Sequence, residues 1–230
     1  MLRSLPWILL IVLICTVLMN WTVAIRTEGP SGKEIPETES PAKSPGVVHG
    51  RERHFATPRQ LADSNGMVEM ALRDIRVQLH TGAWQTWDEL SNQRPVVLVF
   101  LKKDCPCNEE FQPFFQRLEN LYHGQVRFFG VLDGDIDAAA RFARDNRVPY
   151  PIVADPGQQL IRTLKAENGG YNALLNSKGV ITAFFPTCSA DSLTALGGHI
   201  ARLVGLPEKH LDVTGMPGAL TTGCPFERER

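Results

Sequence analysis

The chain has 230 residues, of which 43% are hydrophobic and 21% are charged, so it is long enough to bury one sizeable globular core. Its 24 Lys and Arg residues nearly balance its 25 Asp and Glu residues, and a formal net charge of −1 argues against a nucleic-acid-binding protein. Five cysteines are too few for a fold built from disulfides but sufficient for redox chemistry.

Residues 1–25 predict a membrane anchor. No charged side chain occurs between Arg3 and Arg26, and an apolar helix of this length reaches about 33 Å, enough to cross the hydrocarbon core of a bilayer. Trp7 and Trp21 lie where interfacial aromatic residues are expected. We therefore expect a single-pass membrane protein with its domain on the exported, periplasmic or extracytoplasmic side. A cleaved signal peptide is the alternative.

Residues 26–66 predict a disordered linker. Five prolines and recurrent Gly and Ser residues interrupt this stretch, and its scattered apolar residues cannot compensate for the entropy lost on ordering. A proline-rich linker is semi-extended, so it would hold the next domain on the order of tens of ångströms from the bilayer.

Residues 67–206 predict one domain in which strands and helices alternate. A hairpin that turns at 80–82 comes first, and a short helical turn within 83–90 follows it. The apolar run 95–101 is typical of a strand buried on both faces. In 108–122, aromatic and leucine residues recur at helical spacing, so this segment predicts a helix packed on the sheet.

The second half of the domain continues this alternation. The predicted elements are a strand at 125–132, a helix at 135–147, a short strand in 150–156, a helix at 158–165, a hairpin of 172–176 with 179–185, and a last helix over 189–206 that Ser189 caps. This order predicts an α/β layered sandwich around a central mixed sheet. The Pro- and Gly-rich composition of the tail, 207–230, argues against a helix, and such a tail can fold back over the domain.

Cys105 is the candidate nucleophile. It directly follows the buried strand and precedes the next helix, where unpaired backbone amides and the helix dipole favour a thiolate over a thiol. Lys102 and Lys103 add positive charge that lowers the pKa of a nearby thiol, whereas Asp104 opposes them. A second sulfur, that of Cys107, lies two residues further on. The alternative is a small thiol buried in the core.

The segment 96–118, VVLVFLKKDCPCNEEFQPFFQRL, resembles the strand, active-site turn and helix of the thioredoxin-like superfamily. It is most similar to the peroxiredoxin-type branch, which comprises alkyl hydroperoxide reductase, thiol-specific antioxidant and redoxin domains. The resemblance covers roughly residues 68–206 and places Cys105 at the attacking cysteine and Pro113 at the helix proline. It implies an antioxidant or thiol-disulfide oxidoreductase without a cofactor, acting on a small oxidant or on a protein thiol or disulfide.

Three positions near Cys105 depart from the family pattern. Asn108 stands where a thioredoxin has its second cysteine, and Leu98 and Lys102 stand where a typical peroxidase has Pro and Thr. Because that Thr helps to orient the peroxide, Lys102 argues against ordinary peroxidase activity.

The predicted substrate-facing loop is Gly169-Gly170-Tyr171. Gly170 replaces the cis-proline that faces the active cysteine in the superfamily, so substrate docking is expected to differ here from docking in a standard disulfide reductase.

Two cysteines are candidates to resolve an oxidised Cys105. A disulfide between Cys105 and Cys107 closes a very small ring, so it is strained and oxidising if it forms. Cys224 lies in a terminal Gly-Cys pair, which is similar to the ends of some membrane-anchored bacterial redoxin proteins. Cys188, after the last predicted strand, is expected to be a packed thiol. We therefore predict a membrane-tethered thiol oxidoreductase in which Cys105 attacks and Cys224 or Cys107 resolves.

Two other functions remain open. Cys105 and Cys107 are soft donors that suit Cu(I) or Zn²⁺, and copper-delivery proteins share this fold. In those proteins the two cysteines are further apart, and a histidine lies in a downstream loop. No histidine of this chain lies in the corresponding loop. The third possibility is a tethered, non-catalytic binding domain, which Lys102 and Gly170 favour.

Overall fold

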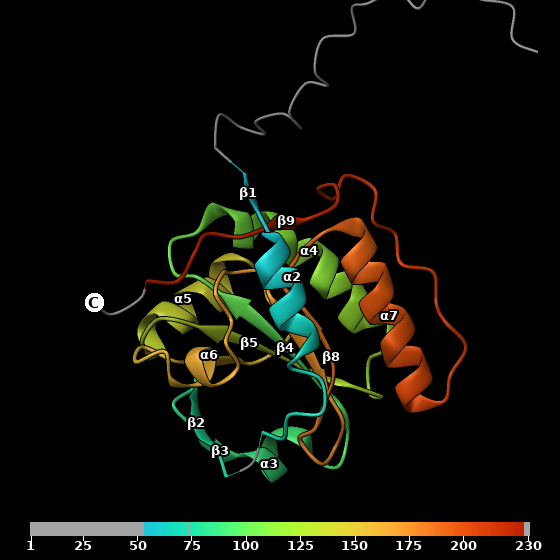
Figure 1. The fold of residues 1–230 in the computed structure, drawn as a ribbon. Coiled ribbons are helices and arrows are strands. Elements are labelled where there is room, and N and C mark those ends of the chain that lie inside the picture. The colour runs from blue at the N-terminus through green and yellow to red at the C-terminus, as the bar shows by residue number, and fades with distance from the viewer. Residues whose placement is uncertain (1–52, 73, 228–230) are drawn as a thin grey trace, which may run out of the picture. The chain divides into compact units, whose positions relative to one another are not determined.

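The computed structural model describes residues 53–72 and 74–227 (Figure 1). Within these residues, no helix is both long and apolar enough to cross a bilayer. The anchor predicted over residues 1–25 and the linker up to residue 52 lie outside the described residues.

A seven-stranded mixed sheet forms the centre of the domain, as predicted. Its strands follow the order β3-β2-β6-β5-β4-β7-β8. Their bounds are β2 (Arg76–Leu79), β3 (Trp84–Thr86), β4 (Val96–Leu101), β5 (Arg127–Leu132), β6 (Ile152–Ala154), β7 (Asn172–Leu175) and β8 (Ile181–Phe185). The three strands β4, β5 and β6 are parallel to one another, and the remaining pairs are antiparallel. All six residues of β4 are buried, which explains its uninterrupted apolar sequence.

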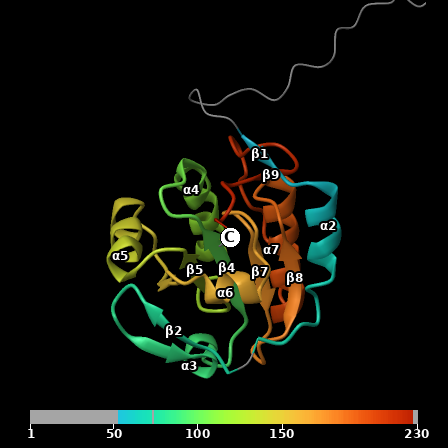
Figure 2. The same ribbon diagram turned by 60° about the vertical axis from the view of Figure 1, so that its left-hand side comes forward.

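Helices cover both faces of the sheet, which is the predicted layered sandwich (Figure 2). One face packs against α4 (Pro106–Leu121), α5 (Ile136–Asp145) and α7 (Ala190–Val204). The other packs against α3 (Trp87–Ser91) and α6 (Gln159–Thr163). Along β4 the side chains alternate between the two cores, because successive residues of a strand point to opposite faces.

The helix that carries the candidate nucleophile is fixed by its apolar face. Phe111, Phe115 and Leu118 recur at intervals of four and three residues and are at most 1% exposed, so they hold α4 against the sheet. Pro106 is the first residue of the helix, where a missing N–H costs no hydrogen bond. The start of α4 is therefore held rigidly at the end of β4.

The predicted linker extended too far along the chain. Residues 53–66 belong to the domain: β1 (His54–Phe55) is followed by α2 (Pro58–Asn65), which packs beside β8. This segment has few apolar residues, and its order comes from hydrogen bonds. The side chains of Thr57 and Gln60 form a reciprocal capping box, which satisfies two backbone N–H groups at the start of α2.

The tail folds back over the domain and adds a second small sheet. β9 (Thr221–Thr222) pairs antiparallel with β1, and the two strands lie side by side in Figure 1. On its other side, the carbonyl of Thr221 accepts a hydrogen bond of 2.7 Å from the backbone N–H of Cys188. The tail is thus held between β1 and the turn that contains Cys188.

Candidate functional site

Cys105 lies at the N-cap of α4, at the end of the central strand. The chain leaves β4 through Asp104, whose φ of 57° is left-handed, and enters the helix with Cys105 in an extended conformation. No side chain caps the helix start, so its amide donors remain for the sulfur of Cys105. The residue is only 4% exposed.

Three cysteines meet at this point. The sulfurs of Cys105, Cys107 and Cys224 all lie within 4.8 Å of one another. The Sγ atoms of Cys105 and Cys224 are 2.7 Å apart, and the backbone N–H of Cys224 donates to the sulfur of Cys105 over 3.3 Å. None of the three is in a disulfide. The structure therefore places both candidate resolving residues beside Cys105, although Cys224 is 119 residues away in the chain.

These neighbours lower the pKa of Cys105 to about 5. The largest cause is the hydrogen bond from the Cys107 thiol, and burial opposes it. The thiol and the backbone N–H of Cys224 contribute further, as does the backbone N–H of Cys107. Because each donor stabilises the thiolate more than the thiol, Cys105 is ionised at neutral pH.

The two donor thiols shift in the opposite direction. The pKa of Cys107 is raised, first by its hydrogen bond to Cys105 and then by burial. Burial, followed by the hydrogen bond to Cys105, raises the pKa of Cys224 to about 11. The three sulfurs together carry one negative charge, which resides on Cys105.

Hydrogen bonds, rather than lysine charge, set the ionisation of Cys105. The ammonium of Lys102 lies 3.0 Å from the carboxylate of Asp133 and 3.7 Å from that of Glu227. The backbone N–H of Lys103 donates to the same Asp133 carboxylate. Lys102 is thus paired with a buried aspartate, and the thiols and amides beside Cys105 are the groups that lower its pKa.

The predicted substrate-facing loop contacts the chain's own tail. The Gly169 N–H donates to the carbonyl of Cys224 over 2.9 Å, and the Gly223 N–H donates to the carbonyl of Gly169 over 2.7 Å. Gly170 has a φ of 84° and lies so close to Phe111 and Cys188 that a side chain would crowd them. None of the described peptide bonds is cis. A substrate could not reach this loop without displacing the tail.

Two residues of the site escaped the sequence analysis. The side chain of Asn168 donates to the carbonyl of Gly223 over 2.9 Å, and it accepts from Gln60 over 2.9 Å. The pattern Thr57-Pro-Arg-Gln60 is a capping-box signature and could have revealed α2. No local pattern marks Asn168, because its partner in the tail is 55 residues away.

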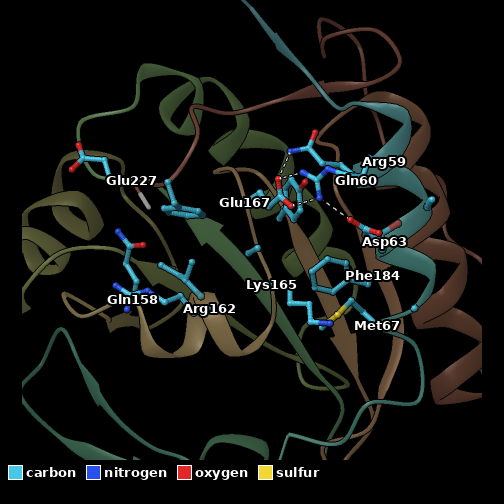
Figure 3. A pocket seen from close by; sticks show the side chains of 17 residues that line it. Arg59, Gln60, Asp63, Met67, Gln158, Arg162, Lys165, Glu167, Phe184 and Glu227 are labelled. Carbon is cyan, nitrogen blue, oxygen red and sulfur yellow. Dashed lines mark hydrogen bonds and ion pairs between the residues drawn. The ribbon is translucent and has the colours of Figure 1, made fainter. Parts of the chain in front are cut away.

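Two clefts differ in their relation to the cysteines. A small cleft of about 170 Å³ reaches Cys105 between the start of α4 and the length of α5, and Arg141 and Phe142 are among its lining residues. A larger cleft of about 770 Å³ lies between α2 and α6, with Phe184 among its lining residues (Figure 3). No cysteine lines the larger cleft, whereas Cys105 lines the small one.

The sequence model of the AhpC/TSA family matches residues 68–185, just over half of the chain. The chain belongs to the AhpC/TSA family. A search of curated proteins found no match. The family segment contains Cys105 and Cys107, whereas β1, α2 and the Cys224 tail lie outside it.

Solved structures share the fold at low identity. A candidate protein disulfide isomerase from Bacteroides thetaiotaomicron is 20% identical, with a TM-score of 0.54 over 60% of this chain and 90% of its own. Peroxidoxin BcpB from Mycobacterium tuberculosis is 16% identical, with a TM-score of 0.52 over 61% and 98%. Peroxiredoxin Q from Xanthomonas campestris is 18% identical, with a TM-score of 0.50 over 57% and 92%. These similarities confirm the thioredoxin-like redoxin fold.

Proposed function

We propose that this protein is a thiol-dependent antioxidant oxidoreductase in which the thiolate of Cys105 reduces a small hydroperoxide without the Thr that typical peroxidases carry at the position of Lys102. The observation that carries the proposal is the contact between Cys105 and Cys224, whose sulfurs lie 2.7 Å apart. One cysteine is ionised, and a second thiol is in place to react with its oxidised form. Family membership supports the same chemistry.

The first step transfers one oxygen atom to sulfur. The thiolate of Cys105 attacks the outer oxygen of the hydroperoxide, the O–O bond breaks, and the alkoxide takes a proton from water to leave as an alcohol. Cys105 becomes a sulfenic acid, so the sulfur is oxidised by two electrons while the peroxide is reduced by two. With a pKa of about 5, Cys105 needs no separate base at neutral pH.

In the second step, the sulfur of Cys224 attacks the sulfenic acid, a disulfide forms, and water leaves. While Cys105 is a thiolate, its hydrogen bond and its charge both raise the pKa of Cys224. Oxidation of Cys105 removes that charge, so Cys224 ionises more readily at the stage when it must act as the nucleophile. Two electrons from an external dithiol then return the disulfide to two thiols.

The shape of the site favours a small oxidant. The tail is bound to Gly169 beside Cys105, and Cys105 lines a cleft of about 170 Å³. Pockets for drug-sized ligands are typically about 300–1,000 Å³. A hydroperoxide fits the small cleft, whereas a folded protein disulfide reaches Cys105 only when the tail moves.

One equivalent of hydrogen peroxide or cumene hydroperoxide, added to the fully reduced chain, tests this function. After the thiols are blocked, mass mapping should recover a Cys105–Cys224 disulfide. One equivalent of the peroxide should be reduced. Cys105→Ser should abolish peroxide consumption, and Cys224→Ser should leave a sulfenic acid that dimedone traps. Cys188→Ser is the matched control and should react like the parent protein. Recovery of Cys105 as a free thiol while the peroxide persists would overturn the proposal.

Copper delivery is the second candidate, because a specific observation favours it. Three sulfurs within 4.8 Å of one another offer a soft, three-thiolate donor set that suits Cu(I). The site would then use Cys224 in addition to Cys105 and Cys107. No histidine joins the group among the described residues.

Copper titration separates the two functions. A copper carrier should bind one equivalent of Cu(I) in competition with bicinchoninate, and serine at any of the three cysteines should weaken that binding. Cys107→Ser divides the candidates most sharply, because a peroxidase without Cys107 still closes the Cys105–Cys224 disulfide. Failure to compete for Cu(I) would eliminate the copper function.

We also propose that residues 1–25 tether the protein to a membrane, with the domain on the exported side. The support is the uncharged apolar run between Arg3 and Arg26. Expression of the full chain followed by carbonate extraction should leave it in the membrane fraction. Added protease should digest the domain only when it has access to the exported side of the membrane. A carbonate-soluble chain that retains its first residues would contradict the tether.

A further inference from the structure

We propose that Asn168 is a positioning residue that holds Cys224 against Cys105, and that Gln60 of α2 orients its side chain. The side chain of Asn168 binds the carbonyl of Gly223, that of Gln60 binds Asn168, and α2 lies outside the segment that matches the AhpC/TSA family. The inference rests on the proposed function only in taking Cys105 and Cys224 as the cysteines that join.

The backbone of the tail is anchored on both sides of Cys224. Before Cys224, the N–H of Gly223 donates to the carbonyl of Gly169 over 2.7 Å. After it, the carbonyl of Cys224 accepts from the Gly169 N–H, and the N–H of Phe226 donates to the carbonyl of Glu167 over 2.8 Å. These contacts set the position of the tail along the loop. They leave the rotation of the peptide unit between Gly223 and Cys224 to be fixed by other groups.

That peptide unit links Asn168 to the reactive sulfur. Its carbonyl, from Gly223, accepts from the Nδ2 of Asn168 over 2.9 Å. Its N–H, from Cys224, donates to the sulfur of Cys105 over 3.3 Å. In a trans peptide the C=O and N–H point in opposite directions, so fixing the carbonyl also aims the N–H at Cys105. A donor on the carbonyl further polarises the peptide unit and strengthens its N–H as a donor.

The direction of this chain of hydrogen bonds is determined by the backbone. The Thr57 N–H can only donate, and it donates to Oε1 of Gln60 over 2.8 Å. The Nε2 of Gln60 must therefore face Oδ1 of Asn168, and this leaves Nδ2 of Asn168 to face the carbonyl of Gly223. No other assignment of the two amides satisfies both ends.

Neither amide has freedom to turn away. Gln60 is 8% exposed and Asn168 is 7% exposed. The Nε2 of Gln60 also donates to the carboxylate of Glu167 over 3.2 Å, and Arg59 pairs with that carboxylate, as Figure 3 shows. Because a buried amide that loses its partner bears the full desolvation cost, these side chains hold one arrangement.

The decisive variants are Asn168→Asp and Gln60→Met. Aspartate keeps the shape of Asn168 but cannot donate to the carbonyl of Gly223 when ionised. Methionine keeps the length of Gln60 but removes the amide that orients Asn168. Each variant should make the Cys105–Cys224 disulfide form roughly three- to tenfold less favourably in glutathione redox buffers, which is the effect of one hydrogen bond. Closure by diamide should slow by a similar factor.

Tyr150→Phe is the matched control for stability. It removes a buried hydrogen bond of 2.7 Å to Gln112, which has no part in the tail. Its disulfide equilibrium should equal that of the parent even when its Tm falls as far as that of Gln60→Met. If Asn168→Asp fails to fold, Gln60→Met decides the question. An unchanged equilibrium in the folded variants, or an equal change in Tyr150→Phe, would overturn the role of Asn168.

The outcome is independent of peroxide chemistry. Glutathione and diamide oxidise the two thiols without a hydroperoxide, so a protein that fails to reduce peroxide still reports the equilibrium between Cys105 and Cys224. Loss of the disulfide only in the Asn168 and Gln60 variants would establish the positioning role whichever substrate Cys105 uses.

Discussion

Two strand-to-helix turns of this sheet each carry a buried cysteine, and only one of them holds a thiolate. Cys105 lies between β4 and α4 and is 4% exposed, and Cys188 lies between β8 and α7 and is fully buried. The pKa of Cys105 is lowered to about 5, whereas burial raises the pKa of Cys188 well above its ordinary value. Location before a helix and burial are therefore common to both turns and do not produce reactivity by themselves.

The hydrogen-bond donors at the two turns make the difference. At the start of α7, the side chains of Ser189 and Ser192 form a capping box and take up the free amides. No side chain caps α4, and two thiols and two amides donate to Cys105. A helix start thus lowers the pKa of a thiol only where its donors are left for the sulfur.

The sharpest test of this comparison is alkylation of both cysteines in one protein. At pH 7, iodoacetamide should modify Cys105 faster than Cys188 by at least on the order of a thousandfold, because only Cys105 is ionised and Cys188 has no exposed surface. Peptide mapping after short exposures measures both rates. Comparable rates would show that the donors around Cys105 do not set its reactivity.

The pH dependence has a definite sign. The pKa of Cys105 is about 5 in the fold, below its ordinary value of 9.0, so its alkylation should be constant near neutrality and fall as pH drops through 5. The same shift stabilises the fold fully above pH 9, and this contribution is lost progressively as pH falls from 9 to 5. The free energy of unfolding in urea should therefore rise more steeply from pH 5 to pH 9 for the parent than for Cys105→Ser. Parallel curves would contradict the shift.

The close contact between the tail and the loop at Gly169 should have the next largest effect. A side chain at Gly223 would lie 2.5 Å from the carbonyl oxygen of Gly169, a backbone atom that cannot move aside. Gly223→Ala should therefore lift the tail and slow closure of the Cys105–Cys224 disulfide by roughly tenfold or more, because closure depends on reacting groups held in contact. Diamide oxidation measures the rate. Gly218→Ala, which meets nothing within 4 Å, is the control.

Loss of one donor thiol should have a smaller effect. The largest single cause of the lowered pKa is the thiol of Cys107, so Cys107→Ala should raise the pKa of Cys105. At pH 6, alkylation of Cys105 should slow by roughly tenfold, which corresponds to a Cys105 pKa about one unit above that pH. Cys107→Ser, which keeps a donor, should lie between the two. An unchanged rate would assign the shift to Cys224 and the amides alone.

The fold was largely predictable from the sequence, because its elements carry strong local patterns. The apolar run of β4, the helical spacing of Phe111, Phe115 and Leu118, and the cap at Ser189 each mark one element. The error over residues 53–66 has a physical cause. Apolar content indicates burial of hydrocarbon, and α2 is ordered mainly by polar contacts of Gln60 and its neighbours.

The site was predictable only in part. Cys105 stands out because a strand pattern ends and a helix pattern begins around it, and the spacing of Cys107 follows from the sequence alone. The contact with Cys224 depends on how the tail crosses residues 167–170, which no local pattern encodes. The ion pair of Lys102 could not be predicted for the same reason, since Asp133 approaches it from another strand end.

Lys102 provides the last and smallest test. Its ammonium is bound to Asp133, whose side chain is 2% exposed, so Lys102→Met leaves a buried carboxylate with the Lys103 N–H but without its ion pair. The free energy of unfolding should fall by about 1–3 kcal/mol, the cost of an unsatisfied buried group. Alkylation of Cys105 at pH 7 should change by less than about twofold, because thiol and amide donors hold its charge. Urea unfolding and peptide mapping on the same variant measure both effects. A large loss of alkylation without a loss of stability would return the control of Cys105 to lysine charge.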